Sequence, residues 1–269
     1  MTASRAKDPD FPFWLAAIVA LGLAAALAIA FSDLYGQIFR TVLKGVGVTV
    51  FVTVVAFALA SAMGLALALM QLSVSLVLRQ TARFYVELIR GVPILVLLFW
   101  IAFAGVPGFV AAWNWLATPL REAGYLGDLL VRDVSLLWRA VLALMFGYAA
   151  FIAEIFRAGI QAVDKGQIES AMALGFSRFQ RFRLIVLPQA LRTILPPLGN
   201  DFVAMVKDSS LVSVLGVADI TQMGKVYAAG SFRFFETYSI VAYIYLILTI
   251  GLSLALRGVE QRMRRGPGE

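Results

Sequence analysis

The residues best suited to chemistry in this sequence are polar groups set inside otherwise apolar stretches. The largest group comprises Asn200, Asp201, Lys207, Asp208 and Ser209. Polar side chains within a membrane-spanning segment usually face the bundle interior or a cavity, and interrupted helices near the midplane build many transport paths. We interpret these residues as a translocation path or gate. Lys207 and Asp208 fit the outer boundary of the membrane equally well.

A second polar group consists of Glu87 and Arg90, which lie three residues apart on one helical face. Pairing between them would lower the cost of bringing charge towards lipid. A snorkelling interfacial pair that simply ends a helix fits the same pattern. Glu154 and Arg157 repeat the spacing, and there we expect a structural ion pair.

The composition excludes most catalytic chemistry. The 269 residues include no His and no Cys, which excludes Ser-His-Asp and Cys-His triads, structural zinc sites and redox dithiols. Asp128 and Asp133 lie in a loop without metal-binding neighbours. No G-x-x-x-x-G-K-[ST] loop is present to cradle phosphates. We therefore predict a chain that is not an enzyme, with no catalytic residue, metal site or cofactor of its own.

A polar stretch over residues 154–210 carries clear helix signals. Asp164 is suited to capping a short helix, with Gln167 three residues later as in a capping box. The predicted helix, Lys165–Leu174, would stop at Gly175, because a residue without Cβ accepts the left-handed conformation of a C-cap.

A second short helix is predicted from Ser177 to Pro188. One face of the first helix is apolar and small, and consists of Ile168, Ala171, Met172 and Gly175. Such a face suits docking into a groove of another protein. A surface turn folded onto its own bundle is the alternative.

The elements that must position these groups are membrane helices. Of the residues, 61% are hydrophobic and 14% charged, and the mean hydropathy is +0.86, whereas soluble domains are roughly 45–50% apolar and about 25% charged. A spanning helix needs roughly 20 mainly apolar residues. We predict an all-α integral membrane protein with six spans: Phe13–Phe31, Val46–Leu72, Phe84–Val106, Val134–Ala153, a broken fifth at Leu184–Val206, and Ser239–Leu256.

The first apolar segment also has features of a signal peptide, because Arg5 and Lys7 precede it. Apolar regions of signal peptides usually span about 7–15 residues, and this segment is longer. We interpret it as a retained anchor helix. The segment Pro107–Asp133 is predicted to be an outside loop with an interfacial helix, since tryptophans such as Trp113 favour the membrane interface.

Small residues recur at every fourth position in two of the predicted helices. The stripes are Ala56, Ala60, Gly64 and Ala68, and Gly22, Ala26 and Ala30. Small residues allow helix backbones to approach closely in lipid. We expect the first stripe to be a packing face, because it extends over four positions.

The net charge of +7 has a topological explanation. With both termini in the cytoplasm, 15 of the 23 Lys and Arg residues fall in inside segments, as the positive-inside rule requires. The sequence has no basic face interleaved with aromatic residues of the kind that binds nucleic acid. We therefore predict contact with membrane lipid and no nucleic-acid partner.

Several motifs now carry a resemblance to a known family. Glu169-Ser170-Ala171, Gly175 and then Ile185-Val186-Leu187-Pro188 resemble the EAA loop of ABC importer permeases, with Ser170 in place of the usual Ala. The motif Glu87-x-x-Arg90-Gly91-x-Pro93 resembles a sequence found in permeases for polar amino acids of the histidine, glutamine, arginine and opine type. The segments Leu187-Pro188-Gln189-Ala190 and Lys207-Asp208-Ser209-Ser210 follow in the expected order.

The resemblance implies a fold and a set of partners. The fold would be the five-helix core of a type I importer over residues 37–257, with a coupling loop at about 154–188. Residues 1–36 would be an added anchor, and residues 258–269 a basic cytoplasmic tail. The partners would be ABC ATPase subunits that bind ATP and Mg²⁺, a second permease subunit in a homodimer or heterodimer, and a periplasmic amino-acid-binding protein.

The resemblance also implies a location and functional residues. The chain would lie in the bacterial inner membrane and move a polar amino acid. Glu87 and Arg90 would join the gate. The residues that couple the permease to its ATPase would be Gly166, Gln167, Glu169, Ser170, Ala171 and Gly175. The alternative function is a stand-alone secondary transporter or channel for a small polar solute.

Overall fold

Every regular element that the computed structural model describes, over residues 13–264, is a helix. Side chains at Trp14, Leu15 and positions 259–264 are outside the description. The predicted N-terminal tail with Arg5 and Lys7, and residues 265–269 of the predicted basic tail, therefore lie outside the described residues.

The elements follow one another with short connections. In chain order they are α1 (Phe13–Phe31), α2 (Asp33–Leu43), α3 (Val46–Gln71), α4 (Leu76–Arg90), α5 (Ile94–Trp100), the π-helical turn η1 (Ile101–Gly105), α6 (Val106–Leu116), α7 (Thr118–Glu122), the 3₁₀ turn η2 (Val131–Asp133), α8 (Leu136–Gln161), α9 (Lys165–Ala173), α10 (Arg178–Arg181), the π-helical turn η3 (Phe182–Val186), α11 (Leu187–Asp208), the 3₁₀ turn η4 (Ser209–Leu215), α12 (Ile220–Ser231) and α13 (Phe234–Arg264).

The centre of the molecule is the packing of α3 against α8. The predicted stripe of Ala56, Ala60, Gly64 and Ala68 is fully buried or nearly so, which confirms it as a packing face. A Cβ on Gly64 would lie 2.8 Å from the Ile152 Cγ2 atom of α8. The shorter stripe on α1 is not buried in this way, and Gly22 has no neighbour within 4 Å of a built Cβ.

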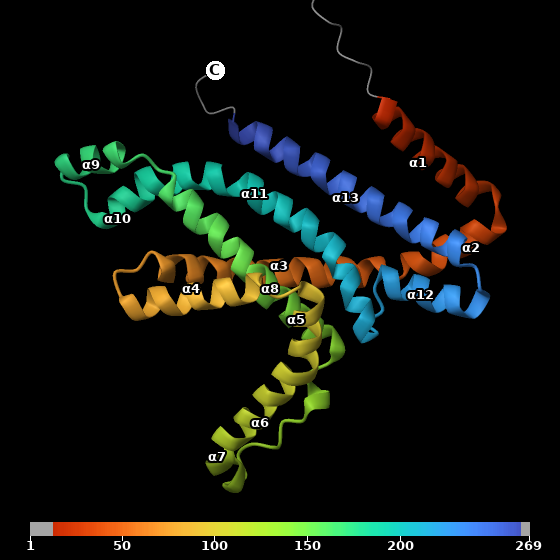
Figure 1. Ribbon diagram of the computed structural model, residues 1–269, viewed down its shortest axis with the longest axis horizontal. Helices are drawn as coiled ribbons and strands as arrows, with labels where there is room; N and C mark the ends of the chain where they lie inside the picture. The colour runs from red at the N-terminus through yellow and green to blue at the C-terminus, as the bar shows by residue number, and fades with distance from the viewer. Residues whose placement is uncertain (1–12, 265–269) are drawn as a thin grey trace, which may run out of the picture.

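The predicted third span, Phe84–Val106, is wrong in its boundaries. α4 ends at Arg90 and lies beside α3 as an antiparallel hairpin, and a new helix starts at Ile94 (Figure 1). Pro93, with φ −57° and ψ 137°, is the break. Proline disfavours helical backbone at the residue before it, so the helix ends there.

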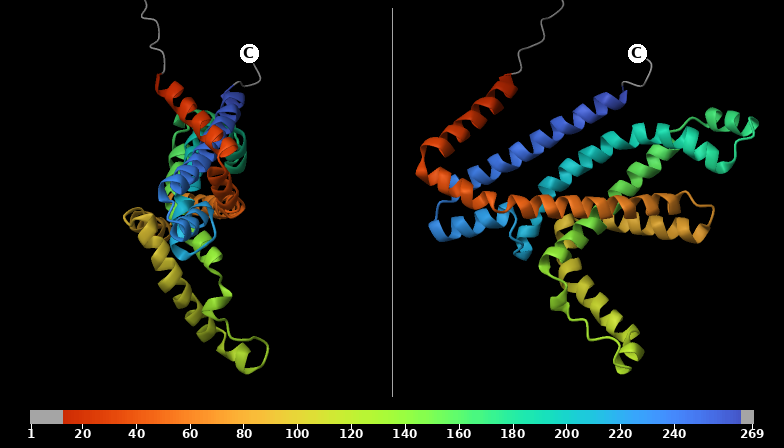
Figure 2. Two further views of the ribbon diagram at one scale, coloured as in Figure 1. Left: turned by 90° about the vertical axis from the view of Figure 1, so that its right-hand side faces the viewer. Right: turned by 180° about the vertical axis from the view of Figure 1, so that it is seen from behind.

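α5, η1 and α6 form one continuous rod that projects away from the other helices in all three views (Figures 1 and 2). The predicted outside loop, Pro107–Asp133, was therefore wrong at its start, because residues 107–116 are helical and apolar. Four described helices are long and apolar enough to cross a membrane: Asp33–Gln71, Ile94–Leu116, Leu136–Gln161 and Phe234–Gly258. Six spans remain a prediction, since the apolar part of α1 is shorter and α11 carries several charges.

The predicted break in the fifth span is absent. From Arg178 to Asp208 the chain stays helical, with Pro196 and Pro197 inside α11. The π-helical turn η3 comes directly before Leu187 and Pro188, and η1 likewise precedes Pro107. In an α-helix the ring of a proline clashes with the carbonyl four residues before it. A π turn inserts one extra residue into the helix, and here it widens the turn that contains that carbonyl. The helix therefore continues past a residue that the sequence marks as a breaker.

A second apolar cluster joins α2, α12 and α13. Its buried members are Ile38, Val42, Ile220, Ile240, Val241 and Ile244. Asp219, fully buried, caps α12 by accepting backbone N–H groups from Thr221 at 3.1 Å and Gln222 at 2.8 Å, and it also accepts the Tyr245 hydroxyl. This cluster holds the beginning of the α2–α3 rod against the C-terminal helices.

We predict that Gly64→Val destabilises the protein while Gly47→Val, on the same helix, does not. Gly47 has no atom within 4 Å of a built Cβ, whereas overpacking a core contact such as that of Gly64 costs about 1–3 kcal/mol. Thermal unfolding in detergent would measure the difference. Equal midpoints for the two variants would contradict the close α3–α8 contact.

Candidate functional site

The short helix predicted after residue 164 is present as α9, and its two ends form as expected. The Asp164 side chain accepts the Gln167 backbone N–H at 3.1 Å. Gly175 has φ +76°, in the left-handed region, and its N–H bonds the Met172 carbonyl at 3.0 Å. Asp164 and Gly175 therefore limit α9 as the sequence predicts.

α9 and α10 lie together at one end of the molecule, between the end of α8 and the start of α11 (Figure 1). Ala171 is buried and Ile168 packs towards Val163 and Ile194. The predicted small apolar face is therefore divided: Ile168 and Ala171 pack onto the chain itself, whereas Met172 and Gly175 are exposed. The other exposed positions on this outward surface are Gly166, Gln167, Glu169, Ser170, Leu174 and, on α10, Phe179.

A side-chain bridge links α9 to α11. The Gln189 Nε2 group donates to Gln167 Oε1 at 2.6 Å and to the Ile185 carbonyl at 3.0 Å. Gln167 thus bonds across to α11 instead of completing a capping box. We did not single out Gln189 from the sequence, although it lies in the Leu187-Pro188-Gln189-Ala190 motif. It connects the surface helix to the helix that carries the polar cluster.

The expected ion pair between Glu154 and Arg157 is confirmed. Two guanidinium nitrogens of Arg157 contact the two carboxylate oxygens of Glu154, at 2.5 and 3.2 Å. Gln71 at the end of α3 also donates to Glu154 Oε1 at 3.2 Å, and Arg157 donates to Gln161 at 2.7 Å. The pair therefore ties the end of α3 to α8 just before α8 leads into α9.

The pairing that the spacing of Glu87 and Arg90 allows does not form, although α4 ends at Arg90 as the alternative interpretation has it. No salt bridge joins these two described residues, and the Arg90 guanidinium lies 5.7 Å from the centroid of the Phe151 ring on α8. A cation–π contact of this kind holds a charged group against an apolar helix. Arg90 therefore braces α4 against α8.

The polar cluster of α11 divides into two groups. The Tyr148 hydroxyl of α8 donates to Asp208 Oδ2 at 2.8 Å, and Asp201 lies seven residues before Asp208 on the same side of α11. The Asp201 Oδ2 atom is buried without a hydrogen-bond partner. Tyr148, which we did not predict from the sequence, therefore belongs with these two carboxylates.

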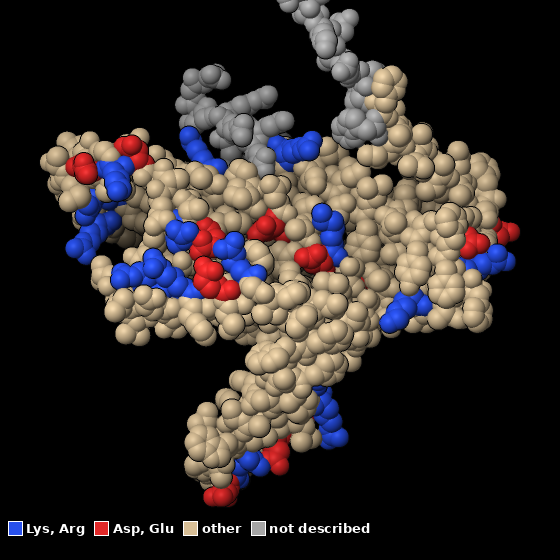
Figure 3. Space-filling model, viewed as in Figure 1, with Lys and Arg blue, Asp and Glu red and all other residues tan. Residues whose placement is uncertain are grey.

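The remaining members of the cluster point elsewhere. The Ser209 hydroxyl is buried and donates to the Val206 carbonyl at 2.7 Å, whereas Asn200 and Lys207 are exposed. Figure 3 shows acidic and basic side chains gathered on one face over α4, α8 and α11. The predicted polar residues therefore do not form one contact network.

The chain matches the family model described as the inner membrane component of binding-protein-dependent transport systems, over residues 60–265. The chain belongs to this family.

Related permeases support this assignment. The chain is 39% identical over 180 residues to the glutamine transport system permease of Escherichia coli, covering 67% of this chain and 73% of that one. It is 36% identical over 189 residues to a probable amino-acid permease of Bacillus subtilis, covering 70% and 76%.

Solved structures extend the similarity to the fold. A chain of an amino-acid ABC transporter crystallised with histidines aligns with a TM-score of 0.68 and 36% identity, covering 83% of this chain and 94% of that one. The methionine transporter MetNI in an inward-facing conformation aligns with a TM-score of 0.65 at 20% identity, covering 83% and 96%. The resemblance to ABC importer permeases is confirmed, and the chain is a multi-pass membrane protein.

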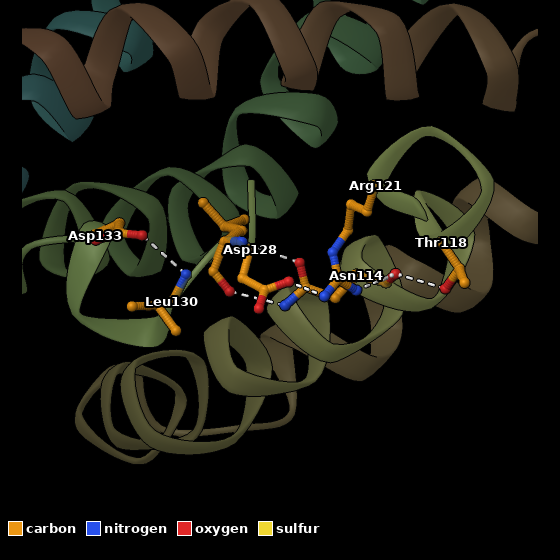
Figure 4. A network of polar contacts seen from close by, with 7 residues as sticks. Asn114, Thr118, Arg121, Asp128, Leu130 and Asp133 are labelled. Atoms are coloured by element: carbon orange, nitrogen blue, oxygen red, sulfur yellow. Dashed lines mark hydrogen bonds and ion pairs between the residues drawn. The ribbon is translucent and has the colours of Figure 1, made fainter. Parts of the chain in front are cut away.

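In this permease the rod α5–α6 ends in a small polar network (Figure 4). Asn114 donates to the Leu129 carbonyl at 2.8 Å and accepts the Leu129 N–H at 3.0 Å. Arg121 pairs with Asp128, and Asp133 accepts the Leu130 N–H at 2.8 Å. Asp128 and Asp133 therefore serve the loop, and no group of three or more potential metal ligands occurs among the described residues.

Arg139 of the permease, at the start of α8, is nearly buried and anchors the base of the rod. Its guanidinium donates to the carbonyls of Val131, Val134 and Ala102. In η1 the Val106 N–H bonds Ile101, and Pro107 has no N–H to offer Ala102. Arg139 supplies the donor that the proline lacks.

Proposed function

We propose that this chain is the permease subunit of an ATP-driven importer that moves a polar amino acid across the bacterial inner membrane. The observation that carries the proposal is the family match over residues 60–265, together with 39% identity to a glutamine permease. Transport would proceed by alternating access, as a two-state equilibrium that a partner biases by binding one state better.

The partners follow from the same relationship. Two ABC ATPase subunits would bind ATP and Mg²⁺, because this sequence has no phosphate-binding loop. A second permease subunit and a periplasmic amino-acid-binding protein would complete the assembly. Both chain termini would lie in the cytoplasm, as the distribution of Lys and Arg favours, and α9 would then meet the ATPase.

Uptake by the assembled transporter tests this class of function. Membrane vesicles containing this chain and its partner subunits should take up glutamine or another polar amino acid only when ATP and the binding protein are supplied. Uptake driven by an ion gradient in the absence of ATP would contradict the proposal and indicate a secondary transporter.

Coupling would pass from the ATPase through α9 to α11. Three connections support this route. The end of α8 leads into α9 after a short turn, and the Gln167–Gln189 bridge, at 2.6 Å, joins α9 to α11. The Glu154 contacts hold α3 to α8. A rigid link of this kind lets a displacement at α9 reach the helix that carries Asp201 and Asp208. The coupling residues would be Gly166, Gln167, Glu169, Ser170 and Ala171 of α9, with Gly175 just after its end.

We predict that Gly175→Pro and Glu169→Lys each reduce uptake to less than roughly a tenth of the wild-type rate while leaving membrane insertion intact. Proline holds φ near about −65°, which is incompatible with φ +76° at Gly175. Lysine reverses an exposed charge on α9. Ser170→Ala, which restores the usual residue of the motif, is the matched control and should leave uptake unchanged. Normal uptake by both test variants would exclude this coupling route.

The translocation path would run along the face that carries Asp201 and Asp208. A buried carboxylate oxygen without a partner, as at Asp201, needs a donor from elsewhere, and the ammonium group of an amino acid is one. Glu87, Arg90, Asn200, Lys207 and Ser209 would belong to the path or gate at its edges.

We predict that Asp201→Asn lowers the transport rate or raises the half-saturating concentration by about tenfold, because hydrogen bonds to charged groups contribute about 1.5–3 kcal/mol. Lys207→Ala should change the same quantities if Lys207 faces the path. Concentration-dependent uptake of radiolabelled amino acid would measure both. Unchanged affinity and rate would identify the two positions as boundary residues only.

A further inference from the structure

A polar cavity of about 240 Å³ lies where α1 turns into α2. Its walls come from a single face of α2 and the last turns of α1: Ile29, Ala30, Ser32, Asp33, Gly36, Gln37, Arg40, Thr41 and Lys44. The family match begins at residue 60, so the cavity belongs to a part of the chain outside that match.

The cavity exists because α2 is strongly two-faced. Ile38 and Val42 are fully buried in the cluster with α12 and α13. This leaves Asp33, Arg40 and Lys44 on the opposite face, beside α1. An apolar helix such as α1 offers these charges no partner.

Neither Arg40 nor Lys44 forms a salt bridge within the described part of the chain. Asp33 stands seven residues before Arg40, or about 10 Å along the helix axis, and the two form no salt bridge. The cavity therefore presents two cations at one end and a carboxylate at the other.

The lengths of α2 and α3 favour a position for this cavity at the level of lipid headgroups. The combined rod from Asp33 to Gln71 has 39 residues, which is about 58 Å of helix against a hydrocarbon core of about 30 Å. α3 alone is long enough to cross, so the polar α2 extends into the interfacial layer. Leu21, Leu23 and Leu27, on the preceding turns of α1, are exposed and present an apolar surface to acyl chains.

We infer that this cavity binds the headgroup of an amine-bearing phospholipid. The phosphate contacts Arg40 and Lys44 as a charge-assisted pair, and the primary ammonium contacts Asp33. The acyl chains lie along α1. One lipid thus satisfies all three charges and fastens the added helix to the rest of the permease, a role separate from transport itself.

Lipid retention tests the inference. The full chain, extracted with its partner subunits, is exchanged into nanodiscs containing equal amounts of phosphatidylethanolamine, phosphatidylcholine and phosphatidylglycerol. Lipids that stay bound on release are identified by native mass spectrometry. The wild type should retain phosphatidylethanolamine several-fold above the other two, because the choline group has no N–H donor and the glycerol group has no cation.

The variants separate the two ends of the headgroup. Arg40→Gln with Lys44→Gln should lower retention of phosphatidylethanolamine roughly tenfold or more, while Asp33→Asn should retain lipid but lose the preference over phosphatidylcholine. Lys225→Gln, at an exposed position of α12, is the control and should match the wild type. Soluble phosphoethanolamine should not displace the lipid.

Three outcomes would overturn the inference. They are equal retention of the three lipids by the wild type, unchanged retention by the double variant, and a loss in Lys225→Gln as large as in the double variant. The last would show that bulk surface charge, and not this cavity, holds the lipid. Monodisperse elution of each variant establishes that it is folded.

Discussion

The close packing of α3 against α8 is the contact on which the rest of the permease depends. Without water inside the membrane, helices associate through dispersion and close approach rather than through exclusion of solvent. Because Gly64 and the alanines of α3 are small, the α3 backbone lies so close to α8 that a Cβ on Gly64 would be 2.8 Å from the Ile152 Cγ2 atom. Because α8 is held there, its far end presents α9, and Tyr148 and Arg139 are fixed opposite their partners on other elements.

Two prolines that would be expected to break helices are accommodated by the same device. η1 precedes Pro107 and η3 precedes Pro188, and each π turn leaves a continuous rod. The carbonyls around these turns receive side-chain donors, from Arg139 to Ala102 and from Gln189 to Ile185. An unsatisfied carbonyl inside a membrane costs several kcal/mol. The Arg139 bond satisfies one carbonyl and joins α8 to η1, whereas the Gln189 bond satisfies one within its own rod.

The polar residues of this chain fall into two groups, those with protein partners and those without. Glu154, Arg139 and Asp219 have several protein partners each and join separate helices. Asp201, Arg40 and Lys44 lack protein partners among the described residues, and the ligands that we propose contact these three residues and, in the lipid site, also Asp33. The distinction rests on hydrogen-bond satisfaction, because a buried or interfacial charge without a partner is costly unless something else supplies one.

The sequence by itself determined the helical membrane class, the family, both ends of α9 and the packing stripe of α3, because composition, capping residues and four-residue spacing act locally along one helix. It did not determine the end of α4 at Arg90, the continuity of α11 through three prolines, or the partners of Arg90, Gln167 and Asp208. Those depend on which helices lie side by side: Phe151 displaces Glu87 as the neighbour of Arg90 only once α4 packs on α8. Partner choice between distant residues is a tertiary property.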